Sequence, residues 1–390
     1  MKLLVIGCGQ CGGRIADEFA RLGRKARAQR GIDIITNALA VNTDIADLSG
    51  LSFIRPDHQH RVLIGVQKTG GHGVGKINEL GAEITREDSD KISEAIKTTR
   101  HFHETDAFLL IASAAGGTGS GAIPILTQYL KERYTEKPLY NLIVLPFRHE
   151  EKVEERTIFN VASCLKSAYL VADAIILIDN QRYIRKDSSL RNNLAKINTF
   201  VVEPFYNLLC AGEEKKPKYI GSKIIDAGDI IQTLVGWTVI GYGKSQMPFF
   251  RSPFKTTHFR EKTSESRRGV QAMNDAINEL SLKCHPADAK RALYLLSAPP
   301  EEMDMNLISE IGNSLKHIAS DAIIRSGDYP RERRSLDVTL ILSELANVGR
   351  IMEYFTKAIR YISSYKKRWE GMEYEHRGIE EAFRDIPSLL

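Results

Sequence analysis

The segment SAAGGTGSG, residues 113–121, decides which fold this sequence encodes. Residues 107–112 before it form an apolar run typical of a strand buried on both faces, and residues 123–134 after it have the pattern of a helix. Glycines interleaved with Thr118 and Ser120 would form a collar of backbone N–H groups with two hydroxyls as extra donors. A turn of this kind, between a strand and a helix, is suited to binding a di- or triphosphate.

Two further glycine turns are predicted on the same sheet. GCGQCG, residues 7–12, follows an apolar strand and spells GxGxxG, and TGGHGVG, residues 69–75, precedes another helix and could close over a terminal phosphate. The turn at 113–121 is not a P-loop, because no lysine follows its glycines in the GK[ST] arrangement. One such turn could simply be tight, but three on one sheet favour phosphate binding.

The order of the predicted elements indicates an α/β fold. Strands are expected at residues 3–6, 32–42, 107–112, 140–146 and 174–178, and helices at 14–22, 77–98, 123–134 and 153–169. Strands that alternate with helices form a parallel sheet covered on both faces, so we expect a Rossmann-like domain.

Beyond this domain the pattern changes. A long apolar-periodic helix is expected at 190–210, followed by a second, smaller α/β domain with helices at 267–284 and 306–319 and strands at 292–297, 322–325 and 336–343. Helices at 348–367 and 369–384 would follow, and the aromatics Phe249, Phe250 and Phe254 would pack a loop between domains. We therefore divide the chain into a nucleotide domain at 1–189, a core helix at 190–213, the second domain at 214–348 and C-terminal helices and tail at 349–390.

Composition excludes several classes of protein. The 390 residues are 43% hydrophobic and 26% charged, and the longest apolar runs are too short to span a bilayer. The chain opens on a strand-like segment without a signal peptide, so we expect it in the cytoplasm. The net charge is +5, a mild excess. The sequence contains no basic stripe with interleaved aromatics, which argues against nucleic acid as a partner. Five scattered cysteines argue against a disulfide framework.

Alternative sites can be weighed from the same residues. GxGxxG also occurs in NAD-dependent oxidoreductases, which need an acidic residue about 20 positions further on, at the end of the second strand. Asp33 lies at the start of that strand and Asp44 comes too late, so the pattern fits badly. Cys8 and Cys11 have redox or zinc spacing but no second pair. The pairs His58/His60 and His101/His103 have no obvious carboxylate or cysteine partner nearby, and we expect surface histidines.

These turns together resemble the tubulin/FtsZ superfamily of filament-forming GTPases. GGTGSG at 116–121 matches the signature loop of that superfamily, and the other loops follow in its order. The segments GCGQCGG, KTGGHGVGKINELGAE, IIDAGDIIQTL and TVIGYG are most similar to CetZ, the archaeal branch. The resemblance covers residues 1–245 with specific motifs, and further on it rests on element order.

The resemblance implies a set of nucleotide contacts. Residues 7–14, 41–44 and 70–75 correspond to the first three phosphate loops, Glu150 to the ribose contact, and Asn180 and Asn198 to the nucleoside and guanine contacts. The whole implied set is Gly9, Gln10, Cys11, Gly12, Gly13, Arg14, Asn42, Asp44, Gly71, Gly73, Gly116, Gly117, Thr118, Gly119, Ser120, Gly121, Glu150, Asn180 and Asn198. The chain departs from the family at Ala115, often glycine in FtsZ, at Thr199, often acidic, and at Glu154, where the family has arginine.

The resemblance also implies catalytic acids and a mode of assembly. Asp226 and Asp229 match the loop that the family inserts into the nucleotide pocket of the next subunit, where they would orient water towards the γ-phosphate. Asp226-x-x-Asp229 is equally a helix-capping pattern, and both roles are compatible. The expected cofactors are GTP or GDP with Mg²⁺ held through the phosphates, and the expected partner is the chain itself, stacked head to tail.

The cellular role and the terminal tail come from the same resemblance. CetZ-like proteins suggest a cytoskeletal function in cell shape or motility, and a non-polymerising regulatory GTP-binding protein stays an alternative. The terminal DIPSLL, residues 385–390, faintly resembles the peptide by which FtsZ recruits membrane adaptors, so a membrane-adaptor contact through the tail is considered too.

Overall fold

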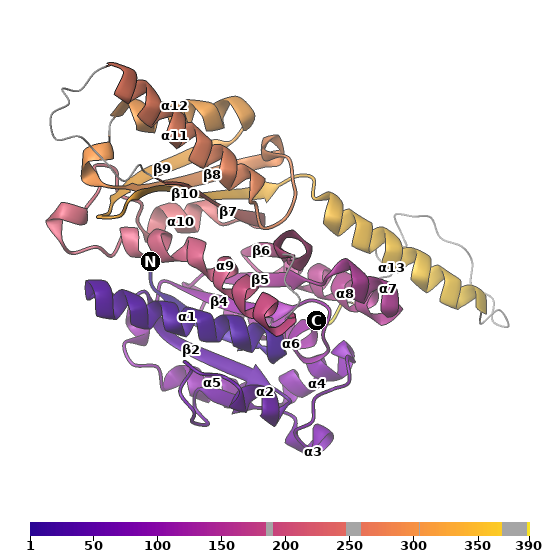
Figure 1. Ribbon diagram of the computed structural model, residues 1–390. Helices are drawn as coiled ribbons and strands as arrows, with labels where there is room; N and C mark the ends of the chain where they lie inside the picture. The colour runs from indigo at the N-terminus through magenta and orange to yellow at the C-terminus, as the bar shows by residue number, and fades with distance from the viewer. Residues whose placement is uncertain (185–189, 247–258, 304, 369–387) are drawn as a thin grey trace. The chain divides into compact units, whose positions relative to one another are not determined.

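The computed structural model describes residues 1–184, 190–246, 259–303, 305–368 and 388–390 (Figure 1). Two compact units divide the chain, and each is described by itself. The glycine-loop unit comprises Leu3–Arg21, Ile35–Asn198 and Val348–Leu390, and the mixed-sheet unit comprises Met1–Lys2, Leu22–Ile34 and Thr199–Asn347.

A parallel sheet forms the centre of the glycine-loop unit. Its strands lie in the order β3 (Arg61–Leu63), β2 (Ile35–Asn42), β1 (Leu3–Cys8), β4 (Ala107–Ser113), β5 (Leu139–Leu145) and β6 (Ala174–Asp179). Each neighbouring pair runs parallel. Every residue of β1, β5 and β6 is buried, as expected for strands covered on both faces. The predicted α/β architecture is confirmed, and the carboxyl ends of these strands share one edge of the sheet.

Helices connect these strands and differ from the sequence prediction at their ends. They are α1 (Gly9–Arg30), α2 (Ile45–Ser49), α3 (Val66–Thr69), α4 (Asn78–Glu87), α5 (Ser89–Lys97), η1 (Phe102–Glu104), α6 (Thr118–Arg133), α7 (Arg148–Val153), α8 (Glu155–Val171), η2 (Asn180–Tyr183) and the C-terminal α13 (Gly349–Arg368). The helix expected at 77–98 is divided at Asp88, because the Asp88 carboxylate accepts the Gly65 N–H at 2.7 Å and pairs with Lys91. Strand β3 has no counterpart in the prediction.

The mixed-sheet unit contains the remaining strands. They lie in the order β7 (Gly236–Gln246), β10 (Ser335–Leu345), β8 (Ala289–Ala298) and β9 (Ile323–Pro330). Strand β10 is antiparallel to β7 and β8, whereas β8 and β9 are parallel. The helices are α9 (Leu190–Ala211), whose residues before Thr199 belong to the glycine-loop unit, η3 (Pro217–Tyr219), α10 (Ala227–Thr233), α11 (Phe259–Asn278), η4 (Pro286–Asp288), η5 (Pro300–Glu302) and α12 (Met305–Ile318).

Strand β7 was not predicted, and its glycines explain how it packs. A Cβ atom on Gly241 or Gly243 would lie 2.1 Å or 1.9 Å from a backbone carbonyl oxygen of α11. Glycine therefore lets α11 lie directly on the strand. This helix begins at Phe259, eight residues before the start at 267 that the sequence predicts. The three phenylalanines at 249, 250 and 254 and the helix expected at 369–384 lie outside the described residues.

Two further observations concern the molecule in general. All five cysteines are free, as the absence of a disulfide framework predicts. Within the described residues, we find no helix with the length and apolar character needed to cross a membrane.

Candidate functional site

The first glycine turn joins β1 to α1 without any intervening residue. Gly9 begins the helix with a φ of +70°, which favours glycine. A Cβ on Gly12 would lie 2.1 Å from the Ile111 carbonyl oxygen, so α1 starts in direct contact with β4. Arg14 is exposed on the next turn, and the Gln10 amide donates to Asp47 at 2.6 Å. The turn therefore directs the N-terminus of α1 to the carboxyl edge of the sheet.

The cysteines of this turn are not poised for redox or metal chemistry. Burial raises the pKa of Cys8 to about 12, and it does the same for Cys11, which is also subject to opposing electrostatic effects from Arg14 and Glu150. Both thiols are protonated at neutral pH, and a protonated thiol is a poor nucleophile and metal ligand.

The glycine-rich turn at 113–121 joins β4 to α6 beside the first turn. Gly117 precedes α6 and has no side chain to cap the first N–H groups, and the space beside Gly116 holds no atom within 4 Å of where its Cβ would stand. A Cβ on Gly119 would lie 2.7 Å from the Cys8 carbonyl oxygen. The N-termini of α1 and α6 therefore meet at one edge of the sheet, where their dipoles and free N–H groups favour an anion.

The second and third loops are bound to each other and to the glycine-rich turn. The Ile45 N–H donates to the Gly71 carbonyl at 3.0 Å, and the Gly73 N–H donates to the Thr43 carbonyl at 3.1 Å. The hydroxyls of Thr43 and Thr118 are 2.6 Å apart. The turns that the sequence singled out thus form one continuous cluster of loops at the carboxyl ends of the strands.

Two predicted contacts in the second loop have structural roles of their own. The Asn42 amide is buried, accepts the Thr43 N–H at 2.8 Å and donates to Asp47 at 3.1 Å. The Asp44 carboxylate caps α2 by accepting the Asp47 N–H at 3.1 Å. Both side chains thus shape this loop.

Sequence reasoning missed Asn160, which holds two of the loops in place. This residue lies on α8 and is completely buried. Its amide nitrogen lies within hydrogen-bond distance of the carbonyl oxygens of Lys76, at 2.9 Å, Ala115, at 3.2 Å, and Gly116, at 3.1 Å. The one sequence signal was an asparagine within a helix whose neighbours are apolar.

The residues expected at the nucleoside lie on three different helices. Glu150 is exposed on α7, and one of its oxygens accepts the Phe147 N–H at 2.8 Å. Asn180 starts η2 directly after β6 and is half-buried. Asn198 is half-buried in α9.

A buried ionic network connects α7 and β6 with α13. The Arg350 guanidinium pairs with the carboxylate of Glu151 and lies 3.6 Å from Asp179, while the Tyr354 hydroxyl donates to Glu151 at 2.7 Å. Each of these side chains is buried. Glu151 and Asp179 are the direct neighbours of Glu150 and Asn180 in the sequence, so α13 fixes the backbone that carries both.

The two acids proposed for catalysis belong to the mixed-sheet unit. Asp226 is exposed at the N-cap of α10 and accepts the Asp229 N–H at 2.9 Å. The Asp229 carboxylate faces back to the Asp226 N–H at 3.4 Å and lies 3.6 Å from the guanidinium of Arg325. The capping interpretation is therefore confirmed, and the acids are held at defined positions on the surface of their unit.

Asp33, the acid that a dinucleotide site would require, is in the wrong place for it. It lies before β2 and pairs with Arg27 at 2.6 Å. A ribose-binding acid would instead stand at the carboxyl end of the second strand. The structure gives no support to the oxidoreductase alternative.

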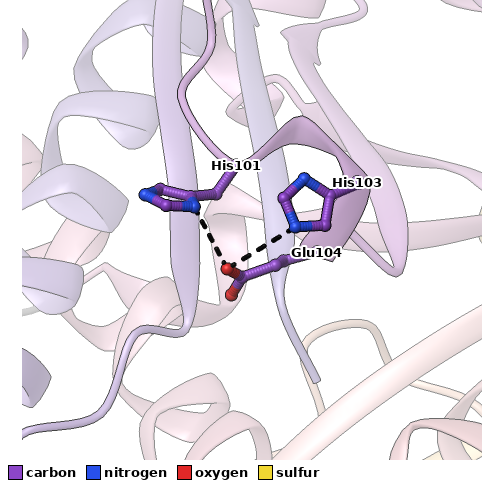
Figure 2. Close-up of side chains that lie close together, drawn as sticks. All are labelled: His101, His103 and Glu104. Carbon is purple, nitrogen blue, oxygen red and sulfur yellow. Dashed lines mark ion pairs between the residues drawn. The ribbon is translucent and has the colours of Figure 1, made fainter.

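The histidine pairs do have carboxylate partners, contrary to the sequence-based expectation. His60 Nδ1 lies 2.7 Å from Asp57, and Glu104 lies 3.3 Å from His101 and 3.9 Å from His103. Figure 2 shows the last three side chains facing one another, and among the residues that the structure describes they form the one group of potential ligands close enough to share a metal ion. The sequence pattern missed these partners because a carboxylate one or three residues away meets the ring only when the chain turns. This cluster lies in the segment just before the amino end of β4, whereas the glycine-rich turn follows the carboxyl end of the same strand.

The fold and the loops together define a nucleotide-binding protein of the tubulin/FtsZ class. Residues 2–186 match the GTPase domain of the tubulin/FtsZ family, and residues 187–360 match the C-terminal domain of tubulin-like CetZ. The chain belongs to the tubulin/FtsZ family of GTPases, within its CetZ group.

Individual relatives and structures agree with this assignment. The chain is 34% identical to tubulin-like protein CetZ1 of Haloferax volcanii over 92% of each chain, and 28% identical to CetZ of Pyrococcus furiosus over 100% of this chain and 98% of the relative. It resembles the structure of H. volcanii CetZ1 as a GDP-bound monomer, with a TM-score of 0.79, 32% identity and coverage of 93% and 100%. For the GTPγS-bound protofilament of H. volcanii CetZ2 these values are 0.78, 27%, 94% and 100%.

Proposed function

We propose that this chain binds GTP and GDP on its cluster of glycine loops, assembles head to tail into protofilaments and hydrolyses GTP where two subunits meet. The observation that carries the proposal is the meeting of the α1 and α6 N-termini, which the close approach of Gly9 and Gly119 makes possible. Two helix N-termini and uncapped backbone N–H groups are the chemistry that a polyphosphate requires. In the structures of the relatives, H. volcanii CetZ1 is bound to GDP and H. volcanii CetZ2 to GTPγS.

The proposed contacts are the residues that the sequence indicated. Residues 9–14 and 116–121 would bind the α- and β-phosphates, and residues 70–75 would close on the γ-phosphate. Glu150, Asn180 and Asn198 would contact ribose and base. Mg²⁺ would be held through the phosphate oxygens and would neutralise their charge. We also propose the domain division that the sequence indicated, at 1–189, 190–213, 214–348 and 349–390.

Hydrolysis would use the acids of a neighbouring subunit. Phosphoryl transfer depends mainly on positioning and charge stabilisation, so the protein has to place a water molecule in line with the γ-phosphate. Asp226 is exposed and Asp229 is half-buried, and the hydrogen bonds that each carboxylate accepts from the other residue's backbone N–H fix their orientation. We assign them to orient that water and to accept its proton.

The cellular role proposed is that of a cytoskeletal filament in the cytoplasm that acts in cell shape or motility. It rests on membership of the CetZ group and on the protofilament that H. volcanii CetZ2 forms in its structure. Shared sites of this kind couple nucleotide state to assembly, since the bound nucleotide lies in the contact between subunits.

The test is the GTP hydrolysis rate per chain across a wide range of protein concentration. A site shared between subunits predicts a rate per chain that rises steeply above a threshold concentration, with filaments visible by electron microscopy in GTPγS. A constant, nonzero rate would show a self-contained GTPase and would favour the non-polymerising regulatory alternative. Absence of both hydrolysis and GTP binding would contradict the proposal altogether.

A further inference from the structure

The last residues of the chain occupy a binding seat on the glycine-loop unit. The side chain of Leu389 is only 5% exposed and packs against Ala82 of α4 and Ile125 of α6. Its neighbour Leu390 is 39% exposed. The apolar contact therefore holds the side chain of Leu389, whereas that of Leu390 stays largely outside it.

Polar side chains of the seat satisfy the backbone of the same residue. The Leu389 N–H donates to the hydroxyl of Ser167 on α8 at 2.7 Å, and the Arg86 guanidinium on α4 donates to the Leu389 carbonyl. The hydroxyls of Ser167 and Ser388 are 3.1 Å apart. Buried backbone groups need partners, and here both are supplied by side chains that are distant in sequence. The seat thus binds an extended peptide segment that contains a leucine.

The helices that form the seat are the ones that carry the phosphate loops. Helix α4 begins at Asn78, shortly after the loop at 70–75, and α6 begins within the glycine-rich turn. Helix α8 carries Asn160, whose amide donates to the carbonyls of Lys76, just after that loop, and of Gly116 in the turn. Helices α4 and α6 are in direct backbone contact, because a Cβ on Gly121 would lie 2.1 Å from the Asn78 carbonyl oxygen. A residue that joins all three helices at the seat therefore restrains the loops at their other ends.

We propose that the C-terminal Leu389 of this chain is a latch: it docks on α4, α6 and α8 of its own subunit and stabilises the loop at 70–75 in the conformation that binds a nucleoside triphosphate. The effect on the nucleotide rests on the proposed function, whereas the docking itself does not. While the latch is docked, the leucine of the terminal DIPSLL is buried and is not available to a membrane adaptor.

The first experiment uses the full chain with Leu389→Asp, which places a charge in the apolar pocket, and Leu390→Asp as its matched control one residue further on. Hydrogen exchange is measured without nucleotide over α4 and the loop at 70–75. We expect exchange about tenfold faster in Leu389→Asp, as for the loss of one buried leucine, and no change in Leu390→Asp. Equal exchange in both variants would overturn the latch.

A second experiment tests the seat directly. A fluorescein-labelled DIPSLL peptide is titrated into each full-length protein. It should bind Leu389→Asp, whose seat is empty, but neither the wild type nor a protein that combines Leu389→Asp with Arg86→Ala. Absence of peptide binding to Leu389→Asp would overturn the proposal. Arg86→Ala alone serves as a further control, because it removes an exposed side chain of the seat and leaves the tail unchanged.

The link to nucleotide is tested with GTPγS. We expect its Kd to rise severalfold in Leu389→Asp and to stay unchanged in Leu390→Asp. If wild-type protein does not bind GTPγS, the proposed function fails while the exchange and peptide results still decide the docking. If α4 exchanges more slowly in the wild type than in Leu389→Asp but both proteins bind GTPγS with the same Kd, the nucleotide part of the proposal would be overturned.

Discussion

Glycine at a few positions determines how closely the loops of the site approach one another. Gly9, Gly119 and Gly121 each stand where a Cβ atom would collide with backbone of another loop or helix. Polar residues complete the arrangement, since Asn160 and Thr118 bind backbone or hydroxyl groups of neighbouring loops. At the residue scale, the site therefore combines glycines that permit contact with a few side chains that hold it.

Gly121→Ala should destabilise the fold, and the matched control is Gly116→Ala, five residues earlier in the same turn. The added methyl on Gly121 would lie 2.1 Å from the Asn78 carbonyl oxygen, whereas the one on Gly116 meets no atom within 4 Å. We expect a loss of about 1–3 kcal/mol in the free energy of unfolding for Gly121→Ala and less than about 0.5 kcal/mol for Gly116→Ala. Urea denaturation measures both, and equal losses would contradict this account of the turn.

Asp226→Asn should separate capping from hydrolysis. Asparagine is as good an N-cap as aspartate, so we expect the free energy of unfolding to change by less than about 0.5 kcal/mol. The amide cannot accept a proton from water, and GTP hydrolysis should fall by about 10²-fold or more. Thermal unfolding, GTP binding and phosphate release are measured together. Unchanged hydrolysis would remove Asp226 from the mechanism.

At the scale of elements, helix α13 stabilises the part of the unit that carries Glu150 and Asn180. Its Arg350 lies between the carboxylates of Glu151 on α7 and Asp179 at the end of β6. Further along, Ala358 packs against Ala162 of α8, with Ile362 beside them. The helix thus contacts the unit through a buried ionic network at its start and an apolar contact nearer its end.

Arg350→Ala is expected to leave the buried carboxylate of Glu151 without its strongest partner. Removing one side of a buried ion pair typically costs about 3–5 kcal/mol, so a large loss in the free energy of unfolding should follow. The matched control is Ile362→Ala on the same helix, which weakens only the apolar contact. GDP affinity should fall for Arg350→Ala more than for Ile362→Ala, and equal affinities would show that the network does not position the nucleoside contacts.

The same helix should contribute to acid sensitivity through Glu353. Partial burial acts to raise the pKa of Glu353, but hydrogen bonds from Lys357 and Arg350 outweigh it and lower the pKa to about 2. A depressed pKa means that the stabilisation is complete above about pH 4.5 and is lost as the pH falls towards 2. Glu353→Gln should therefore lose less stability than the wild type between pH 5 and pH 2 in urea titrations. Parallel pH profiles would contradict the assignment.

At the scale of the whole molecule, the proposed reaction needs two copies of the chain. One copy would supply the glycine loops, and the other would supply Asp226 and Asp229. Within each copy, the loops belong to the glycine-loop unit and both acids belong to the mixed-sheet unit. Activity would then be a property of the filament.

Mixing two inactive variants tests this requirement. Asp229→Asn lacks a catalytic acid but retains the loops. Gly116→Arg adds a side chain where no atom lies within 4 Å, so it should block the proposed phosphate site and leave the fold and the acids intact. In an equal mixture some contacts would pair intact loops with intact acids, so part of the wild-type hydrolysis rate should return. Each variant alone is the control. A mixture as inactive as its components, with both variants still in filaments, would contradict a shared site.

Much of the site was predictable because it depends on local sequence. The glycine turns at 7–12, 69–75 and 113–121 each follow or precede an element whose apolar pattern is evident, and parallel strands place such turns at one edge. The capping pair Asp226 and Asp229 was likewise evident from spacing alone. By contrast, β3 and β7 were not predicted, because one is too short for a pattern and the other contains glycines that a helix requires for packing.

By itself, the sequence determined most of the order of strands and helices, the glycine turns and the family, since each is encoded in neighbouring residues. Only the tertiary structure decided what Asn160, Arg350 and Leu389 do. The partners that define these roles, Gly116, Glu151 and Ser167, lie 44, 199 and 222 residues away in the chain. No local pattern specifies which of many distant groups a buried side chain will meet. Burial makes these contacts necessary, because a polar group removed from water must find a partner, and the fold determines which partner it finds.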